Sequence, residues 1–314
     1  MLLSRAPWLS ILLLGLACAL LSGCAASISG LSIPTTTATG APEQIPARIF
    51  KPDGAGPFPA VVIMHDCSGV GPHSSGAPAR WAGELVGRGY VAIVPDSFTT
   101  RGHAGGVCTD PSPTRVEVGP GPRVRDAYAA LAYLRTLPYV EGSSVGIMGG
   151  SHGGATTLAS IAAAENNKDL FAREKRAGFA AGVALYPGCA APFGAWRVAR
   201  DSSTGAVLQY TGVYKPVAPL LILVGESDDW TPAEPCQRLT DAAQRAGYPV
   251  RLKVYPGAHH SFDSDRPVVF VGARVNANSP TGRGATTGGN AEAWADSIRE
   301  VAAFFSQYLA QGRK

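Results

Sequence analysis

The sequence predicts an α/β fold in which a mostly parallel sheet is flanked by helices. Three observations predict it: short apolar runs recur along the chain, stretches with helically spaced apolar residues separate several of them, and glycine-rich or polar segments follow directly after the runs. Strand runs that alternate with helical runs favour crossover connections and therefore a parallel sheet. We expect the central strands at residues 60–64, 91–94, 144–148, 180–185, 220–224 and 251–255.

Two helices are visible as apolar stripes at a spacing of three or four residues. Pro138 closes the first helix, and the second ends the chain. A long segment rich in Gly, Asn and Thr, 263–290, precedes the second helix, and we expect it to be a loop that covers the pocket. The two stripes comprise Val124, Ala127, Tyr128, Leu131 and Leu134, and Trp294, Ile298, Val301, Phe305 and Tyr308.

The most informative segment is the hexapeptide Gly-Gly-Ser-His-Gly-Gly at residues 149–154, which places Gly-x-Ser-x-Gly around Ser151. An apolar strand run precedes it and a helix-prone run, 155–161, follows it. A serine at a tight strand-to-helix turn is lifted clear of the sheet, and glycines permit the turn because side chains there would clash with neighbouring backbone. The alternative is a glycine turn with a capping serine, but the strand–turn–helix context favours a nucleophile.

Acidic residues and histidines follow Ser151 at the ends of two later strand runs. Asp228 and Asp229 come just after 220–224, and His259 and His260 come just after 251–255. A serine hydroxyl is a poor nucleophile at neutral pH, so it needs an imidazole as base and a carboxylate that orients the imidazole. Because the carboxyl ends of parallel strands meet at one edge of a sheet, we expect these groups to lie together.

These segments resemble the dienelactone hydrolase family of α/β-hydrolases over about residues 45–310. The resemblance implies an α/β-hydrolase fold and hydrolysis of esters. The family pattern Gly-x-x-Asp-x-x-x-Pro implies that Asp228 is the acid, with Asp229 as the alternative. A histidine followed by a small residue and phenylalanine implies His260 rather than His259. The resembling segments are 61–66, 95–98, 149–154, 225–232 and 255–262.

Two residues depart from the family pattern. Ser151 stands where the founding members have a nucleophilic cysteine, and Asp66 stands where they have a glutamate. Serine-bearing relatives are read as carboxylesterases of broad or unknown substrate, so dienelactone itself is in doubt as the substrate. Asp66 remains a candidate for substrate binding.

Further site residues are expected around Ser151. The backbone N–H of His152, the residue after the nucleophile, should donate to the oxyanion, and the resemblance implies the N–H of Cys67 as the second donor. The resemblance also places Arg101 at about the position of a carboxylate-binding arginine, the alternative being a solvated loop residue. Trp230, close to the acid, either walls the substrate pocket or packs beneath its loop.

Four cysteines lie beyond the first 24 residues, and they allow three pairings. Strand neighbours in this fold favour the disulfides Cys67–Cys108 and Cys189–Cys236, and free buried thiols are the alternative. The spacing of His65, His73 and His103 matches no zinc motif, so we expect neither a metal nor a cofactor.

The N-terminus predicts export and lipid anchoring. Arg5 and the apolar run 11–21, which is shorter than the ~20 residues of a membrane span, indicate a signal peptide. The motif Leu-Ser-Gly-Cys ending at Cys24 resembles a bacterial lipobox; ordinary secretory cleavage is the alternative. Because Ala25 rather than aspartate follows Cys24, we expect an outer-membrane anchor that faces the periplasm.

The predicted organisation is a signal peptide at 1–23, a flexible tether at 24–44 and one hydrolase domain at 45–314. The net charge of +4 is small and scattered, which argues against nucleic acid as a partner. We expect a serine hydrolase that acts on small-molecule esters. A peptidase with the same residues and a non-catalytic, lipid-anchored binding protein are the alternatives, and the sequence does not indicate an oligomeric state.

Overall fold

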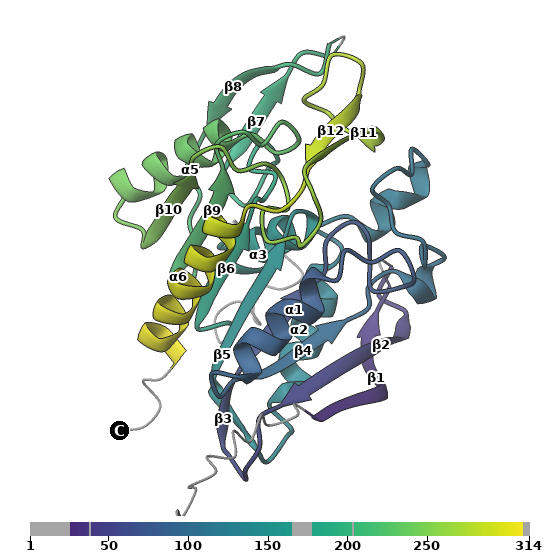
Figure 1. Ribbon diagram of the computed structural model, residues 1–314, viewed down its shortest axis with the longest axis vertical. Coiled ribbons are helices and arrows are strands. Elements are labelled where there is room, and N and C mark those ends of the chain that lie inside the picture. The colour runs from purple at the N-terminus through teal and green to yellow at the C-terminus, as the bar shows by residue number, and fades with distance from the viewer. Residues whose placement is uncertain (1–25, 38, 165–177, 203, 310–314) are drawn as a thin grey trace, which may run out of the picture.

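The computed structural model describes residues 26–37, 39–164, 178–202 and 204–309, so the predicted signal peptide and Cys24 lie outside the described residues. Its centre is an eight-stranded sheet with the strand order β1-β2-β4-β3-β5-β6-β9-β10 (Figure 1). The six strands that the sequence predicted, β4-β3-β5-β6-β9-β10, are parallel, which confirms the predicted fold class. The eight strands are β1 (Ala26–Thr36), β2 (Pro42–Lys51), β3 (Phe58–Met64), β4 (Val91–Pro95), β5 (Val140–Gly150), β6 (Ala181–Leu185), β9 (Leu220–Gly225) and β10 (Val250–Tyr255).

Helices cover both faces of this sheet (Figure 1). Successive side chains of a strand point to opposite faces, so Val62 of β3 packs with α2, α3 and α5, whereas Val61 packs with α1 and α6. Both faces are therefore apolar, as expected for a parallel sheet. The helices are α1 (Ala77–Val86), α2 (Val124–Leu134), α3 (His152–Ile161), α5 (Ala233–Arg245) and α6 (Ala291–Leu309), with the short 3₁₀ helices η1 (Thr99–Arg101) and η2 (Pro113–Val118).

The first two strands occupy most of the segment that we expected to be a flexible tether, so that prediction is wrong. β1 pairs antiparallel with β2, and β2 pairs antiparallel with β4 at the edge of the sheet. Ile33 of β1 and Ile45 of β2 are fully buried. The Ser, Thr, Gly and Pro content suggested a linker, but isoleucine and threonine also favour strands, and burial on one face decides the outcome here.

The segment 263–290, predicted as a loop, contains a two-stranded hairpin, which corrects that expectation. Its strands are β11 (Val269–Val275) and β12 (Arg283–Thr287), and a second hairpin pairs β7 (Arg197–Arg200) with β8 (Val207–Thr211). Both hairpins lie beyond the carboxyl ends of the central strands (Figure 1). No helix in the described part of the chain has the length and apolarity needed to cross a membrane.

Both predicted disulfides are confirmed. Cys67 bonds Cys108 with an S–S distance of 2.04 Å, and Cys189 bonds Cys236 at 2.05 Å. Each bridge joins segments that follow neighbouring strands: the first joins the segments after β3 and β4, and the second joins the segment after β6 to α5.

Candidate active site

Ser151 occupies a sharp turn between β5 and α3. It has φ 53° and ψ −117°, and its N–H donates to the carbonyl oxygen of Leu185 at 2.9 Å. The turn requires glycine at its flanks, because a Cβ on Gly153 would lie 1.9 Å from the carbonyl oxygen of Met64. The same restriction holds at Gly149, where a Cβ would lie 2.5 Å from the backbone of Gly153. The local sequence therefore forces Ser151 outward at the end of the strand.

A chain of hydrogen bonds joins Ser151 to a histidine and an aspartate. Nε2 of His260 lies 2.9 Å from Oγ of Ser151, and Nδ1 of His260 lies 2.8 Å from Oδ2 of Asp228. All three residues are buried. A carboxylate only accepts hydrogen bonds, so Nδ1 of His260 donates and Nε2 is left to accept the proton of the serine hydroxyl.

Asp228 is itself held in place by its own loop. Its Oδ1 accepts the backbone N–H groups of Trp230 at 2.9 Å and Thr231 at 2.8 Å. The ring of Trp230 packs 4.7 Å from the ring of His260, and the ring of Tyr186 packs against His260 at the same distance. The acid and the imidazole are thus fixed by backbone donors and by aromatic walls, as a preorganised site requires.

Asp229 and His259, the alternative acid and base, form hydrogen bonds with other residues. Both carboxylate oxygens of Asp229 accept hydrogen bonds from Thr286 of β12, through its backbone N–H and its hydroxyl. Nδ1 of His259 lies 2.9 Å from the carbonyl oxygen of Ser227, to which it donates. The structure therefore brings Asp228 and His260, rather than their neighbours, to Ser151.

The two expected oxyanion donors lie beside Ser151. His152 is the first residue of α3, and Cys67 follows β3; both line the cavity at Ser151. Within the described part of the chain, neither backbone N–H has a hydrogen-bond acceptor. Two free N–H groups near a nucleophile can bind a negatively charged oxygen.

Asp66 supports the Cys67 loop rather than the cavity. Its Oδ1 accepts the backbone N–H of Ser68 at 2.7 Å, and its Oδ2 accepts the hydroxyl of Ser75. It is buried and does not line the cavity, so the expectation that it contacts substrate is wrong. A short carboxylate directly after a strand can fold the next residues around itself.

Arg101 is likewise not a substrate-binding residue, which corrects that expectation. Its guanidinium forms ion pairs at 2.7 Å with Glu43 of β2 and at 2.7 Å with Asp126 of α2. All three side chains are largely buried. A guanidinium matches two carboxylates geometrically, and Glu43 was assigned to a tether in the sequence analysis, so this partner could not be foreseen.

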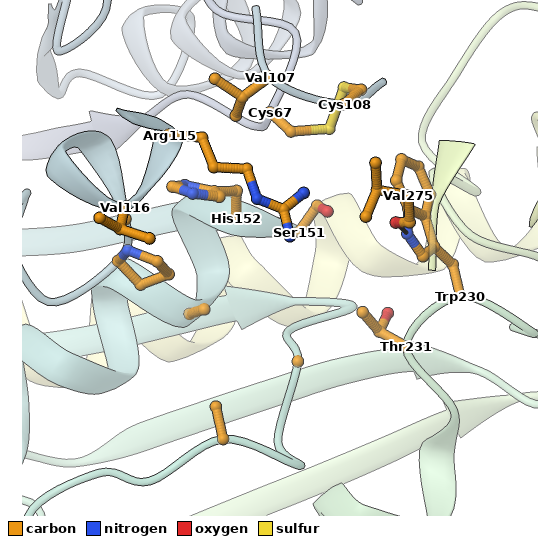
Figure 2. Close-up of a pocket in the computed structure, with 15 residues that line it drawn as sticks. Cys67, Val107, Cys108, Arg115, Val116, Ser151, His152, Trp230, Thr231 and Val275 are labelled. Atoms are coloured by element: carbon orange, nitrogen blue, oxygen red, sulfur yellow. Dashed lines mark hydrogen bonds between the residues drawn. A yellow bond between two sulfur atoms is a disulfide. The ribbon is translucent and has the colours of Figure 1, made fainter. Parts of the chain in front are cut away.

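The cavity in front of Ser151 has a volume of about 390 Å³ (Figure 2). Trp230 and Val275 form one wall, which is the first of the two positions expected for Trp230. Ser151, His152 and Arg115 project into the cavity across from that wall. The remaining lining residues are mostly apolar: Cys67, Val107, Cys108, Val116, Gly119, Pro120, Ala155, Gly188, Ala191 and Thr231.

Three residues next to the site, the fully buried Arg123 and His65 and the half-buried His152, form contacts that the sequence did not show. Arg123, just before α2, is fully buried, with Nη1 2.6 Å from Nδ1 of His152 and Nη2 2.9 Å from the carbonyl oxygen of His65. Burial, together with the Arg123 charge, holds the pKa of both His65 and His152 well below the usual range. Burial lowers the pKa of Arg123 to about 10, so it remains charged at neutral pH. No local motif marks Arg123, because its partners come from distant segments.

Among the described residues, one cluster, Asp66 with Cys67 and Cys108, has the ligand types of a metal site. Both of its sulfur atoms belong to a disulfide, so no thiolate is free to coordinate an ion.

Comparisons with known proteins agree with this geometry. The model of the dienelactone hydrolase family matches residues 45–309. A protein named carboxymethylenebutenolidase from Methylorubrum extorquens is 27% identical over 267 residues, which cover 80% of this chain and 83% of the relative. A protein of the same name from Synechocystis sp. is 25% identical over 282 residues, 85% of this chain and 93% of the relative.

Solved structures share the fold. A dienelactone hydrolase from Klebsiella pneumoniae superposes with a TM-score of 0.59 at 20% identity, covering 90% of this chain and all of that chain. The dienelactone hydrolase-like promiscuous phosphotriesterase P91 from metagenomic libraries superposes with a TM-score of 0.58 at 20% identity, covering 90% of this chain and 99% of its own. With the family model spanning nearly all of the described residues, the chain belongs to the dienelactone hydrolase family and is a hydrolase.

Proposed function

We propose that the protein is a serine hydrolase of small-molecule carboxylic esters, which works through an acyl-enzyme on Ser151. The observation that carries the proposal is the hydrogen-bonded chain from Ser151 through His260 to Asp228, whose serine lines the cavity. This chain has the geometry of a nucleophile, its base and the carboxylate that orients the base.

The reaction follows from these positions. Nε2 of His260 takes the proton of the Ser151 hydroxyl as Oγ attacks the ester carbonyl carbon. The carbonyl oxygen becomes an oxyanion and accepts hydrogen bonds from the N–H groups of Cys67 and His152. Collapse of this intermediate breaks the bond to the alcohol, which leaves with the proton from His260.

Water then releases the acid. His260 takes a proton from the water molecule, the resulting hydroxide attacks the acyl carbon, and the bond to Oγ of Ser151 breaks. Ser151 recovers its proton from His260, and the carboxylic acid leaves. The Asp228 carboxylate stabilises the imidazolium that forms twice in each cycle.

The shape of the cavity supports small esters as substrates. A volume of about 390 Å³ with mostly apolar walls is at the lower end of ordinary ligand pockets. The relatives named carboxymethylenebutenolidase also act, by their name, on a small molecule. A peptide chain on both sides of Ser151 would need a longer groove, so the ester reading is favoured over a peptidase.

We also propose that the mature protein is a lipid-anchored envelope protein of the periplasm. The support is the apolar run 11–21 and the motif that ends at Cys24. The two disulfides of the hydrolase domain fit an oxidising compartment.

The test of the ester-hydrolase proposal is the nucleophile itself. Wild-type protein should be labelled by a fluorophosphonate probe and should hydrolyse p-nitrophenyl acetate, whereas Ser151→Ala should do neither. Ser143→Ala, an exposed serine near the opposite end of β5, is the matched control and should behave as wild type. Undiminished ester turnover in Ser151→Ala would overturn the proposal.

A further inference from the structure

The side chain of His152 lies between a buried arginine and the cavity. On one side, Nδ1 is 2.6 Å from Nη1 of Arg123, which is fully buried beneath the ring of Phe98 and held by the carbonyl oxygen of His65. On the other side, His152 is partly exposed and lines the cavity next to Ser151 (Figure 2). The imidazole is therefore a wall of the proposed active site as well as the residue that follows the nucleophile.

Arg123 fixes the tautomer of this imidazole. A guanidinium has only N–H donors and no acceptor, so the contact forms only if Nδ1 of His152 carries a lone pair. The charges of Arg123 and Arg115, added to burial, keep the pKa of His152 well below the usual range. A neutral imidazole whose Nδ1 accepts has its proton on Nε2.

The Nε2–H group has no acceptor among the described residues. The Nδ1 side is covered by Arg123, which has no exposed surface, so the exposed part of the ring is the side that faces the cavity. An N–H donor in a mostly apolar cavity needs an acceptor, and leaving it unpaired when substrate displaces water is costly.

We propose that His152 is a specificity-determining residue, whose Nε2–H donates a hydrogen bond to an ether, hydroxyl or carbonyl oxygen on the substrate group that occupies this cavity. The inference rests on the proposed ester hydrolysis and names the substrate class more closely: esters whose acyl or alcohol group carries a hydrogen-bond acceptor within a few bonds of the ester. A site built to bond a polar atom discriminates strongly against the analogue that lacks it.

Arg115 is the competing donor in the same cavity. It stands on η2, its Nη1 donates to the carbonyl oxygen of Asp110 at 3.0 Å, and it reaches toward Ser151 (Figure 2). Among the described residues its guanidinium bonds a single backbone oxygen, whereas Nδ1 of His152 is bonded by the fully buried Arg123. A test must therefore separate the two donors.

The test uses isosteric ester pairs on purified full-length protein. The acyl pair is p-nitrophenyl butyrate and p-nitrophenyl methoxyacetate, and the alcohol pair is butyl acetate and 2-methoxyethyl acetate. Within each pair an ether oxygen replaces one methylene. The measured quantity is the ratio of kcat/KM for the ether ester to that for the alkyl ester, compared between variants so that the intrinsic reactivity of each ester cancels.

The matched variants are His152→Gln and His152→Met. Glutamine can accept from Arg123 through its carbonyl oxygen and still present N–H donors to the cavity, whereas methionine has a similar length but no donor. In one of the two pairs, the ratio should fall about tenfold in His152→Met, as expected for one unpaired hydrogen bond, and should stay within about threefold of wild type in His152→Gln. Arg115→Gln should leave the ratio unchanged.

Several outcomes would overturn the inference. An unchanged ratio in His152→Met for both pairs would show that His152 does not contact the acceptor. A ratio that collapses in Arg115→Gln but not in His152→Met would assign the role to Arg115. Absence of ester turnover in the wild type would instead contradict the proposed function, so the two failures are distinguishable.

A spectroscopic measurement checks the tautomer independently of activity. In ¹⁵N-labelled protein, the His152 ring signals, identified by their loss in His152→Gln, should show a neutral imidazole protonated at Nε2 at neutral pH. A protonated imidazolium at neutral pH, or a ring protonated at Nδ1, would contradict the proposal.

Discussion

Strained residues in this molecule gather around His260. The non-glycine residues with positive φ among those described are Ser151, Tyr186 and Ser261, at φ 53°, 36° and 59°. Ser151 bonds His260, Tyr186 packs its ring against it, and Ser261 follows it in the chain. Positive φ is uncommon for residues with a Cβ, and it persists where surrounding structure determines it. The strain therefore supports a site whose geometry is held rather than adaptable.

Single-residue substitutions should separate the site from its neighbours. His260→Ala should lower kcat for p-nitrophenyl acetate by at least about 10³-fold, because the serine loses its base. Asp228→Asn should also be severe, because the imidazole loses the acceptor that fixes its tautomer. His259→Ala and Asp229→Asn should stay within about tenfold of wild type, since neither transfers a proton. A steady-state comparison of the four variants, with folding checked by circular dichroism, would refute the assignment if the ranking were reversed.

At the scale of elements, the cavity is built from segments that are tied to one another beyond the sheet. The Cys67–Cys108 disulfide joins the proposed oxyanion loop to the segment after β4, and the carbonyl oxygen of Cys108 accepts the N–H of Val275 in β11. The carbonyl oxygen of Val275 in turn accepts Nε1–H of Trp230, which packs on His260. One covalent bond and two hydrogen bonds thus connect the two sides of the cavity.

Removal of this disulfide should therefore affect turnover more than removal of the other. The Cys67→Ser/Cys108→Ser variant should lose about 2–4 kcal/mol of unfolding free energy and also at least roughly tenfold in kcat, part of the about 10²–10³-fold that a lost oxyanion donor costs. The Cys189→Ser/Cys236→Ser variant is the control, with a similar loss of stability and kcat within about threefold of wild type. Urea denaturation and ester kinetics on both variants measure this. Equal kcat values in the two variants would contradict a positioning role.

The elements that the sequence predicted well are those with both faces buried. β4 and β9 are continuous apolar runs, and each was predicted to within one residue at either end. β1, β2 and the β11–β12 hairpin bury one face or less and carry Ser, Thr, Gly and Pro, so their composition resembles that of a linker. Their stability comes from pairing with segments far along the chain, which a local pattern does not contain.

The same distinction applies to the site. Ser151 follows a strand end in a recognisable local pattern, and the resemblance to the family pattern selected Asp228 and His260 from their neighbours. The partners of Arg101 and Arg123 come from elements up to 58 residues away, and only the fold brings them together. The charge of a side chain can be read from sequence, but whether it faces substrate or another buried charge depends on packing.

For the whole molecule, two neutral histidines, the fully buried His65 and the half-buried His152, make stability depend on pH. His65 is paired at both nitrogens, with the carbonyl oxygen of Asp66 at 2.9 Å and the N–H of Ser97 at 3.1 Å, and His152 is held by Arg123. The pKa of each lies well below its usual value because burial and Arg123 disfavour the charged form. Below a pH of about 6.5 and above the lowered pKa values of the folded state, the unfolded chain binds a proton at each histidine and the folded chain does not. Stability therefore rises with pH in that window and falls on acidification through it.

In His152→Gln, unfolding below a pH of about 6.5 should take up one proton fewer than in wild type, so its unfolding free energy should depend less on pH. Between pH 6.5 and pH 5, the unfolding free energy of wild type should fall more steeply than that of His152→Gln, by up to about 1.4 kcal/mol per pH unit. Subtracting the unfolding free energy of His152→Gln from that of wild type at each pH removes the contributions of the titrating groups that the two proteins share. Urea denaturation at several pH values measures it, and parallel curves for the two proteins would show that His152 titrates alike in the folded and unfolded states.

Anchoring is also a property of the whole molecule. Expressed in a Gram-negative host, wild-type protein should fractionate with membranes and carry acyl mass on its first mature residue, Cys24. Cys24→Ala should lose the acyl mass and lipoprotein-type cleavage, while the hydrolase domain still folds and hydrolyses esters. Intact-mass analysis of both proteins decides this, since a mature chain that begins elsewhere without acyl mass is incompatible with the proposal.

The direction of β1 gives this anchor a geometric consequence. β1 is antiparallel to β2, and β2 is antiparallel to β4, so β1 runs in the same direction as the six central strands. Ala26, two residues after Cys24, therefore lies at the amino ends of the central strands, whereas Ser151 lies at their carboxyl ends. An 11-residue strand such as β1 spans about 35 Å. A lipid on Cys24 would tether the enzyme at this end of the sheet, and Ser151 lies at the other end. With the tethered end on the bilayer, Ser151 would face the surrounding water, and dissolved esters would reach the cavity directly.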